Sequence, residues 1–141
     1  MSIFVDTGVF VSFANKRDKN HDRAVELFDE LRSSKHGMVY TSDYVFDESV
    51  TTALVRTRRV EVAVKTGFLI LGSKEPKIPP VARMLRVDER TFQEAWKTFY
   101  SRTMPGLSFT DHTSVSLSRS YAGAAIMSFD EDFDALLTRI G

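Results

Sequence analysis

The segment SIFVDTG (residues 2–8) decides how this chain folds. It opens with a short run of β-branched and aromatic residues, which is typical of a buried strand. The run stops at Asp6, and an apolar helical turn follows Thr7 and Gly8. A buried strand that ends on a carboxylate and passes into a helix is typical of an α/β protein, in which sites form at the carboxyl ends of the strands.

Strands and helices alternate along the rest of the chain. Further strands are expected over residues 38–41, 84–87 and 124–129, and helices over 21–35, 43–58, 60–71, 89–100, 110–121 and 132–138. This alternation predicts a parallel sheet with helices packed against it. The apolar spacing predicts that Leu54 of one helix faces inward, together with Phe92, Trp96 and Tyr100 of another.

Length and composition are typical of one ordinary globular domain. The chain has 141 residues and no linker that would divide it, so we expect a single domain over 1–141. The absence of cysteine excludes disulfides and zinc–thiolate sites and suits a reducing compartment. No apolar stretch approaches the roughly 20 residues of a membrane span. The N-terminus has no basic leader, so we expect a cytoplasmic protein with no membrane partner.

Acidic residues stand where the predicted elements change type. Asp6 and Asp130 each end a strand. Glu48 lies in the second turn of one predicted helix, and Asp111 begins another. The carboxyl ends of parallel strands share one edge of the sheet, where all four side chains would meet. Like charges gathered there are costly unless a cation neutralises them, so the pattern predicts a divalent-metal site.

The chemistry of such a site favours a nuclease. Magnesium and manganese prefer hard oxygen ligands and need no histidine or cysteine. A bound ion lowers the pKa of a water molecule and offsets the charge of a phosphate. Neighbouring hydroxyls of Thr7, Thr110 and Ser128 could orient the ligands. Asp132 is either a helix cap, an accessory ligand or both.

Basic residues supply a candidate surface for nucleic acid. Nineteen basic and nineteen acidic residues leave a net charge of zero, so such a partner would need a local basic patch. Arg56, Arg58 and Arg59 form one cluster, and Lys16 to Lys19 lie in a loop elsewhere. These residues are candidates for contacts with an RNA backbone, and a solvated helix end is the equal alternative.

Taken in order, the motifs resemble the PIN-domain ribonucleases, and most closely their small VapC-like members, the toxins of bacterial and archaeal toxin–antitoxin pairs. The resemblance covers almost the whole chain. Besides Glu48, it rests on the segments VDTG (5–8), NHDRAVELF (20–28), LSFTDHTSVSLS (107–118) and SFDEDFD (128–134). It implies a three-layer α/β/α domain with a central parallel sheet of four to five strands.

The resemblance also implies an activity and partners. Asp6, Glu48, Asp111 and Asp130 would be the catalytic acids of an Mg²⁺- or Mn²⁺-dependent endoribonuclease. Asp6, Asp111 and Asp130 would bind the metal, with Glu48 and Asp132 as further candidates. VapC-like proteins generally form homodimers and bind an antitoxin protein. We therefore expect an RNA substrate and a dimer, whose apolar surface would come from the first two helices and the helix over 60–71.

Other functions fit the pattern less well. A PIN nuclease that processes RNA without a toxin role has the same motifs. A catalytically silent PIN-like module that binds protein or RNA would be expected to lack at least one of the acids. A haloacid-dehalogenase phosphatase needs a second Asp where this chain has Gly8. A receiver domain needs a strand that ends in Lys, and no predicted strand does. Metal-dependent RNA cleavage is therefore the expected function.

Overall fold

A computed structural model describes residues 1–101 and 104–141. Five strands form one sheet in the order β3-β2-β1-β4-β5, and every neighbouring pair is parallel. The strands are β1 (Ser2–Val5), β2 (Met38–Ser42), β3 (Arg83–Leu85), β4 (Ala125–Met127) and β5 (Thr138–Ile140). The predicted α/β class with a central parallel sheet is confirmed.

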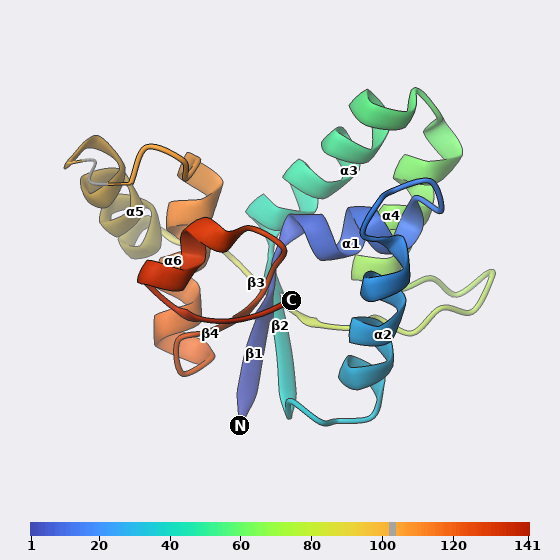
Figure 1. Cartoon of the computed structure of the whole chain (residues 1–141), viewed down its shortest axis with the longest axis horizontal. Coiled ribbons are helices and arrows are strands. Elements are labelled where there is room, and N and C mark those ends of the chain that lie inside the picture. The colour runs from blue at the N-terminus through green and yellow to red at the C-terminus, as the bar shows by residue number, and fades with distance from the viewer. Residues whose placement is uncertain (102–103) are drawn as a thin grey trace.

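Helices cover both faces of this sheet. They are α1 (Thr7–Ala14), α2 (His21–Arg32), α3 (Asp43–Thr57), α4 (Val60–Leu71), α5 (Glu89–Ser101) and α6 (Phe109–Tyr121), with a 3-10 helix η1 (Glu131–Ala135). Figure 1 shows α5 and α6 on one side of the sheet and α1, α2 and α4 on the other. Within the described residues, no helix is both long and apolar enough to cross a membrane.

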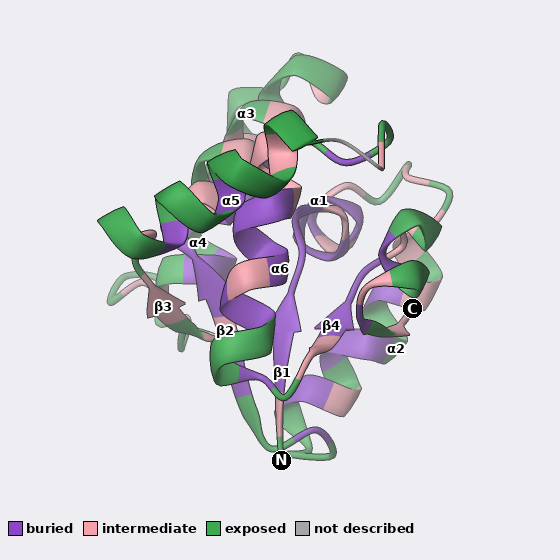
Figure 2. Ribbon diagram, turned by 90° about the vertical axis from the view of Figure 1, so that its left-hand side faces the viewer, coloured by how far each residue is buried: buried purple, intermediate pink, exposed green. Residues whose placement is uncertain are grey.

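The core surrounds β1, which lies in the middle of the sheet. Ile3, Phe4 and Val5 are all buried, because helices cover the strand on both faces (Figure 2). A parallel strand in this position has a continuous apolar run instead of an alternating one. On one side, Phe10 of α1 and Phe28 of α2 pack edge to face, with ring centroids 6.1 Å apart. The opening segment of the sequence is thus the centre of the fold.

The end of the chain differs from the predicted helix over 132–138. The 3-10 helix stops at Ala135, and Thr138–Ile140 forms β5 beside β4. Pairing with the free edge of β4 satisfies backbone groups that a last helical turn would leave without partners. A strand of 3 residues is too short to show a period of two in the sequence.

Several apolar side chains predicted to face inward are exposed. Phe92, Trp96 and Tyr100 of α5 are 41%, 48% and 61% exposed, and Leu54 of α3 is 42% exposed. For the side chains of α5 the reason is that this helix packs on α6 and not on the sheet, so it lies one layer further out (Figure 1). Only a narrow stripe of α5 around Ala95 is buried there.

Candidate metal centre

The site lies where the order of the strands reverses. From β1 the chain builds outward to β2 and β3, and later places β4 and β5 on the other side of β1. Asp6 directly follows β1, and Asp130 comes shortly after β4. A crevice forms at such a switch point, outside the carboxyl ends of the strands. Here it is a cavity of about 470 Å³.

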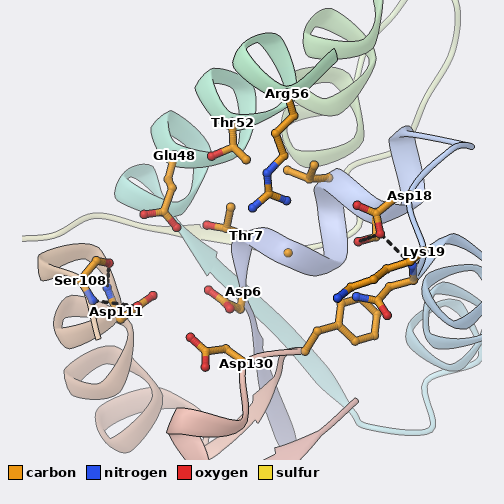
Figure 3. A pocket seen from close by; sticks show the side chains of 15 residues that line it. Asp6, Thr7, Asp18, Lys19, Glu48, Thr52, Arg56, Ser108, Asp111 and Asp130 are labelled. Carbon is orange, nitrogen blue, oxygen red and sulfur yellow. Dashed lines mark hydrogen bonds between the residues drawn. The ribbon is translucent and has the colours of Figure 1, made fainter. Parts of the chain in front are cut away.

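Five carboxylates line this cavity, and four of them belong to the predicted acids: Asp6, Glu48, Asp111 and Asp130. Figure 3 shows these four converging on one end of it, whereas Asp18 lies at the other end. One carboxylate oxygen from each of Asp6, Glu48 and Asp111 lies within 4.8 Å of the other two. The predicted acids are therefore brought together, three of them closely and Asp130 on the adjoining wall.

Helix caps hold two of these acids in place. The hydroxyl of Ser42 accepts a hydrogen bond from the backbone N–H of Val45, which fixes the start of α3 and so the position of Glu48 in its second turn. At the start of α6, Ser108 and Asp111 form a reciprocal capping box. The Ser108 N–H donates to Asp111 Oδ2 at 2.9 Å, and the Asp111 N–H donates to Ser108 Oγ at 3.1 Å. The carboxylate of Asp111 is thereby oriented by the helix terminus.

Burial and mutual repulsion raise the pKa values of two of the acids. Asp6 is only 6% exposed. Its pKa is raised to about 7, mainly by burial and in addition by the negative charges of Asp111 and Glu48. Hydrogen bonds from Ser128 and from the backbone of Thr7 favour the ionised carboxylate and oppose this rise. Burial is also the main reason why the pKa of Asp111 rises to about 6. Ionised carboxylates in this position are unfavourable without a counter-charge.

The donor set fits a hard divalent cation. Among the described residues, the buried Oδ1 of Asp6 has no hydrogen-bond partner, and buried polar atoms are rarely left in that state. The neighbouring donors from Glu48 and Asp111 are also carboxylate oxygens. Mg²⁺ and Mn²⁺ prefer such oxygens. A cation at this point would provide both the missing partner for Asp6 and the missing counter-charge.

Of the three hydroxyls predicted to support the ligands, two lie at the site. Ser128 donates to Asp6 Oδ2 at 2.7 Å, and the Thr7 side chain lines the cavity. Thr110 does not line it; its carbonyl accepts a hydrogen bond from the hydroxyl of Thr113 within α6. Ser108 is the residue that was missed, although a serine three positions before Asp111 is a capping-box signal that the sequence carries.

The structure gives Asp130 the capping role that was expected of Asp132. Asp130 caps η1, since its Oδ1 accepts a hydrogen bond from the Asp132 N–H at 2.9 Å, and it lines the cavity as well. Asp132 was expected to be a cap or an accessory ligand. It is exposed and does not line the cavity. Its carboxylate lies against the α-carbon of Gly106, in the loop before α6.

The opposite end of the cavity carries two basic side chains beside the carboxylate of Asp18. Arg56 reaches into it from the last turn of α3, and Lys19 reaches into it from the loop between α1 and α2 (Figure 3). Arg58 and Arg59, which the sequence grouped with Arg56, do not line it. Lys19 could not be placed beside Arg56 in advance, because the path of a loop is not readable from its composition.

Comparison with known proteins agrees with this geometry. The sequence profile of the PIN domain matches residues 3–136. The chain belongs to the PIN domain family. A VapC ribonuclease of Archaeoglobus fulgidus is 23% identical over 112 residues, which cover 79% of this chain and 66% of that protein. This PIN domain thus spans just under two thirds of the length of that relative.

Two solved structures share the fold of this PIN domain. The VapC20 toxin of Mycobacterium tuberculosis, described as cleaving the sarcin–ricin loop, matches with a TM-score of 0.77 and 28% identity, over 94% of this chain and 93% of that one. VapBC2 from Rickettsia felis, bound to a DNA fragment from its promoter, matches with a TM-score of 0.62 and 14% identity, over 99% of this chain and 96% of that one.

Proposed function

We propose that this PIN domain is a metal-dependent endoribonuclease and the toxin of a VapC-like toxin–antitoxin pair. The observation that carries the proposal is the close approach of the carboxylates of Asp6, Glu48 and Asp111. In addition, the buried Oδ1 of Asp6 has no hydrogen-bond partner in the described residues. The likeness to a VapC ribonuclease and to the VapC20 toxin supports the choice of RNA as substrate.

Each residue has a proposed part in the reaction. Asp6, Glu48 and Asp111 would hold magnesium or manganese, and Asp130 would complete the ligand set from the cavity wall. A bound divalent ion supplies Lewis acidity, which offsets the charge of a phosphodiester and lowers the pKa of water. Ser128 keeps the carboxylate of Asp6 in a fixed orientation, and Ser108 does so for Asp111. Such support from outside the ligand set strengthens metal binding.

The basic end of the cavity would bind the substrate. Arg56 and Lys19 lie across the cavity from the four acids (Figure 3). With Asp18 as the one carboxylate beside them, a strand of RNA that enters from their side meets a net positive charge before it reaches the proposed metal. Glu48, Thr52 and Arg56 follow one another at intervals of four residues, which puts them on one face of α3. That face therefore runs from the proposed metal to the proposed phosphate contact.

Partners follow from the same comparison. Because VapBC2 is a solved toxin–antitoxin complex with this fold, we propose that an antitoxin protein binds this chain too. We also propose a homodimer, but its contact surface differs from the one expected from the sequence. The first helix is largely buried, whereas Leu54 on α3 and Val60, Val64, Phe68 and Leu71 on α4 are exposed. A second copy of the chain would cover these apolar side chains.

An RNA cleavage assay with paired variants tests the proposal. The wild-type protein should cut single-stranded RNA in Mg²⁺ or Mn²⁺ and stop in excess chelator. Glu48→Gln should lose most of this activity, while Asp47→Asn should retain it, since Asp47 is adjacent in sequence but exposed and outside the cavity. Cleavage that persists in chelator, or equal losses in the two variants, would contradict the metal mechanism.

A further inference from the structure

A second, smaller cavity lies beside the acidic one and is rich in arginine. Its volume is about 180 Å³. Its lining residues are Asn15, Arg17, Arg56, Thr57, Arg59 and Val62. Arg56 lines both cavities, so the two are adjacent. We call this second cavity the arginine pocket. In this pocket Arg17, from the loop after α1, joins Arg56 and Arg59 from the end of α3 and the turn that follows it.

Local hydrogen bonds shape the backbone around the arginine pocket. Oδ1 of Asn15 accepts a hydrogen bond from the Arg17 N–H at 3.1 Å in the loop after α1. The hydroxyl of Thr57 accepts one from the Arg59 N–H at 3.1 Å in the turn between α3 and α4. Arg58 lies in the same turn with a left-handed φ of 58° and lines neither cavity. The turn therefore separates Arg58 from Arg56 and Arg59.

The charge of the arginine pocket is only partly balanced by ion pairs of the described residues. Within residues 1–101 and 104–141, Arg17 and Arg56 form no ion pair. Arg59 binds Glu61 through its Nε at 2.7 Å, which leaves its two terminal amino groups for another contact. Guanidinium groups present donors in a fixed fork that matches the oxygens of a phosphate. Three of them around a small cavity suit an anion.

We propose that the arginine pocket binds a phosphodiester group of the RNA substrate, further along the strand from the bond that is cut. This inference rests on the proposed ribonuclease function and adds a positioning site to it. Arg56 follows Glu48 by eight residues on α3, a rise of about 12 Å along the helix axis. A strand held in the arginine pocket could thus extend past Arg56 to the acids, and the pocket would set which bond lies over them.

A purely structural role for these arginines makes a different prediction. Cations at the C-terminal end of a helix interact favourably with its dipole, and Arg56 lies in the last turn of α3. In that case its replacement would lower stability without a specific effect on RNA. Arg17 separates the two explanations, because it comes from the loop after α1 and not from α3. Arg58 is the matched control, as an exposed arginine in the same cluster that lines neither cavity.

The test measures RNA affinity in an Asp6→Asn background, which prevents cleavage, with chelator present. Fluorescence anisotropy of a labelled single-stranded RNA is recorded over a range of salt concentrations. Arg17→Ala should weaken binding several-fold and reduce the salt slope by about 0.7, the amount expected for one phosphate contact on a single strand. Arg58→Ala should change neither. Arg17→Lys keeps the charge and should retain the slope, which controls for a loss of folding in the alanine variant.

A second measurement locates the contact on the RNA. Oligonucleotides that carry one uncharged methylphosphonate linkage are compared, with the linkage moved along the strand. At one position the neutral linkage should weaken binding as much as Arg17→Ala does, and it should have no further effect in Arg17→Ala. Equal affinities and slopes for Arg17→Ala and Arg58→Ala would overturn the inference. If the wild-type protein still cut RNA in the presence of metal, the proposed function would stand without the arginine pocket.

Discussion

Ser128 and Asp6 stand 122 positions apart in the sequence and are joined by a hydrogen bond of 2.7 Å from Ser128 Oγ to Asp6 Oδ2. The same hydroxyl accepts a hydrogen bond from the Asp130 N–H at 3.0 Å. One buried serine therefore connects the carboxyl ends of β1 and β4. Its bond to Asp6 favours the ionised carboxylate and opposes the rise in pKa that burial causes.

Removal of this hydroxyl should weaken metal binding. In Ser128→Ala the pKa of Asp6 should rise further and its carboxylate should lose its fixed orientation. We expect the affinity for Mn²⁺ to fall by roughly 10-fold or more, and the free energy of unfolding to fall by about 1–3 kcal/mol. Calorimetric titration and thermal melts measure the two effects.

Ser118→Ala is the control for this experiment. Ser118 is also buried, but it donates to the Ala125 carbonyl at 2.9 Å and not to a carboxylate. It should lose stability without losing affinity for Mn²⁺. A similar loss of affinity in both variants would mean that Ser128 acts only through the general packing of the core.

The raised pKa of Asp6 predicts how the stability of the metal-free protein depends on pH. The pKa of Asp6 is about 7 in the folded state against an ordinary value of 3.8. Between these values the unfolded chain loses the proton while the folded protein keeps it, so the free energy of unfolding falls as pH rises from about 4 to 7. Mn²⁺ should restore stability at pH 7.5 more than at pH 5.

Asp6→Asn isolates this contribution from that of the histidines and other acids. In chelator at pH 7.5 the variant should be more stable than the wild-type protein by roughly 2–4 kcal/mol, because a pKa shift of one unit corresponds to ~1.4 kcal/mol. At pH 4 the advantage should largely disappear. Thermal melts across this pH range measure it. A variant that is less stable than the wild type at pH 7.5 would show that the ionised carboxylate of Asp6 does not destabilise the metal-free protein.

The fold and the four acids could be predicted because their signals are local. The run before Asp6 and the alternation of elements are sufficient for a parallel sheet. A parallel sheet then requires that Asp6 and Asp130 share an edge. The place of Ser108 at the site was also readable, as a capping box with Asp111. These features depend on residues a few positions apart and on one rule of topology.

What could not be predicted depends on contacts between distant segments. Trp96 and Tyr100 have the spacing of a buried helix face, but which layer a helix occupies is decided by its neighbours. The strand β5 is too short to be recognised without its partner β4. The joining of Arg17 to Arg56 depends on the path of the loop after α1. No local pattern in the sequence encodes any of these three.

Mutations should distinguish the role of Asp130 from that of Asp132. Asp130→Ala removes both a cap and a cavity-lining carboxylate, so it should cost about 1 kcal/mol of stability and also weaken Mn²⁺ binding. Asp130→Asn keeps an oxygen that can accept the Asp132 N–H, so it should weaken metal binding while leaving stability nearly unchanged. Asp132→Ala should change the free energy of unfolding by less than about 0.5 kcal/mol. Loss of Mn²⁺ binding in Asp132→Ala alone would show that the fourth ligand is Asp132.

The exposed apolar side chains of α3 and α4 predict self-association. Light scattering at micromolar concentrations should give twice the mass of the 16.0 kDa chain. Phe68→Glu should shift the mass toward the monomer, because Phe68 is 37% exposed in the middle of that surface and a charge there would oppose burial. Trp96→Glu, on the exposed face of α5, is the control for a general loss of solubility. A wild-type protein that remains a monomer in this measurement would contradict the proposed dimer.

A crystal of the protein soaked in manganese tests the central claim most directly. Anomalous scattering identifies Mn²⁺ independently of water. The account predicts a peak among the carboxylates of Asp6, Glu48 and Asp111, with Asp6 Oδ1 within about 2.5 Å of the ion. It also predicts that the peak disappears in Asp6→Asn crystals soaked in the same way. A structure with no peak there, at a concentration of Mn²⁺ that supports RNA cleavage in solution, would contradict it.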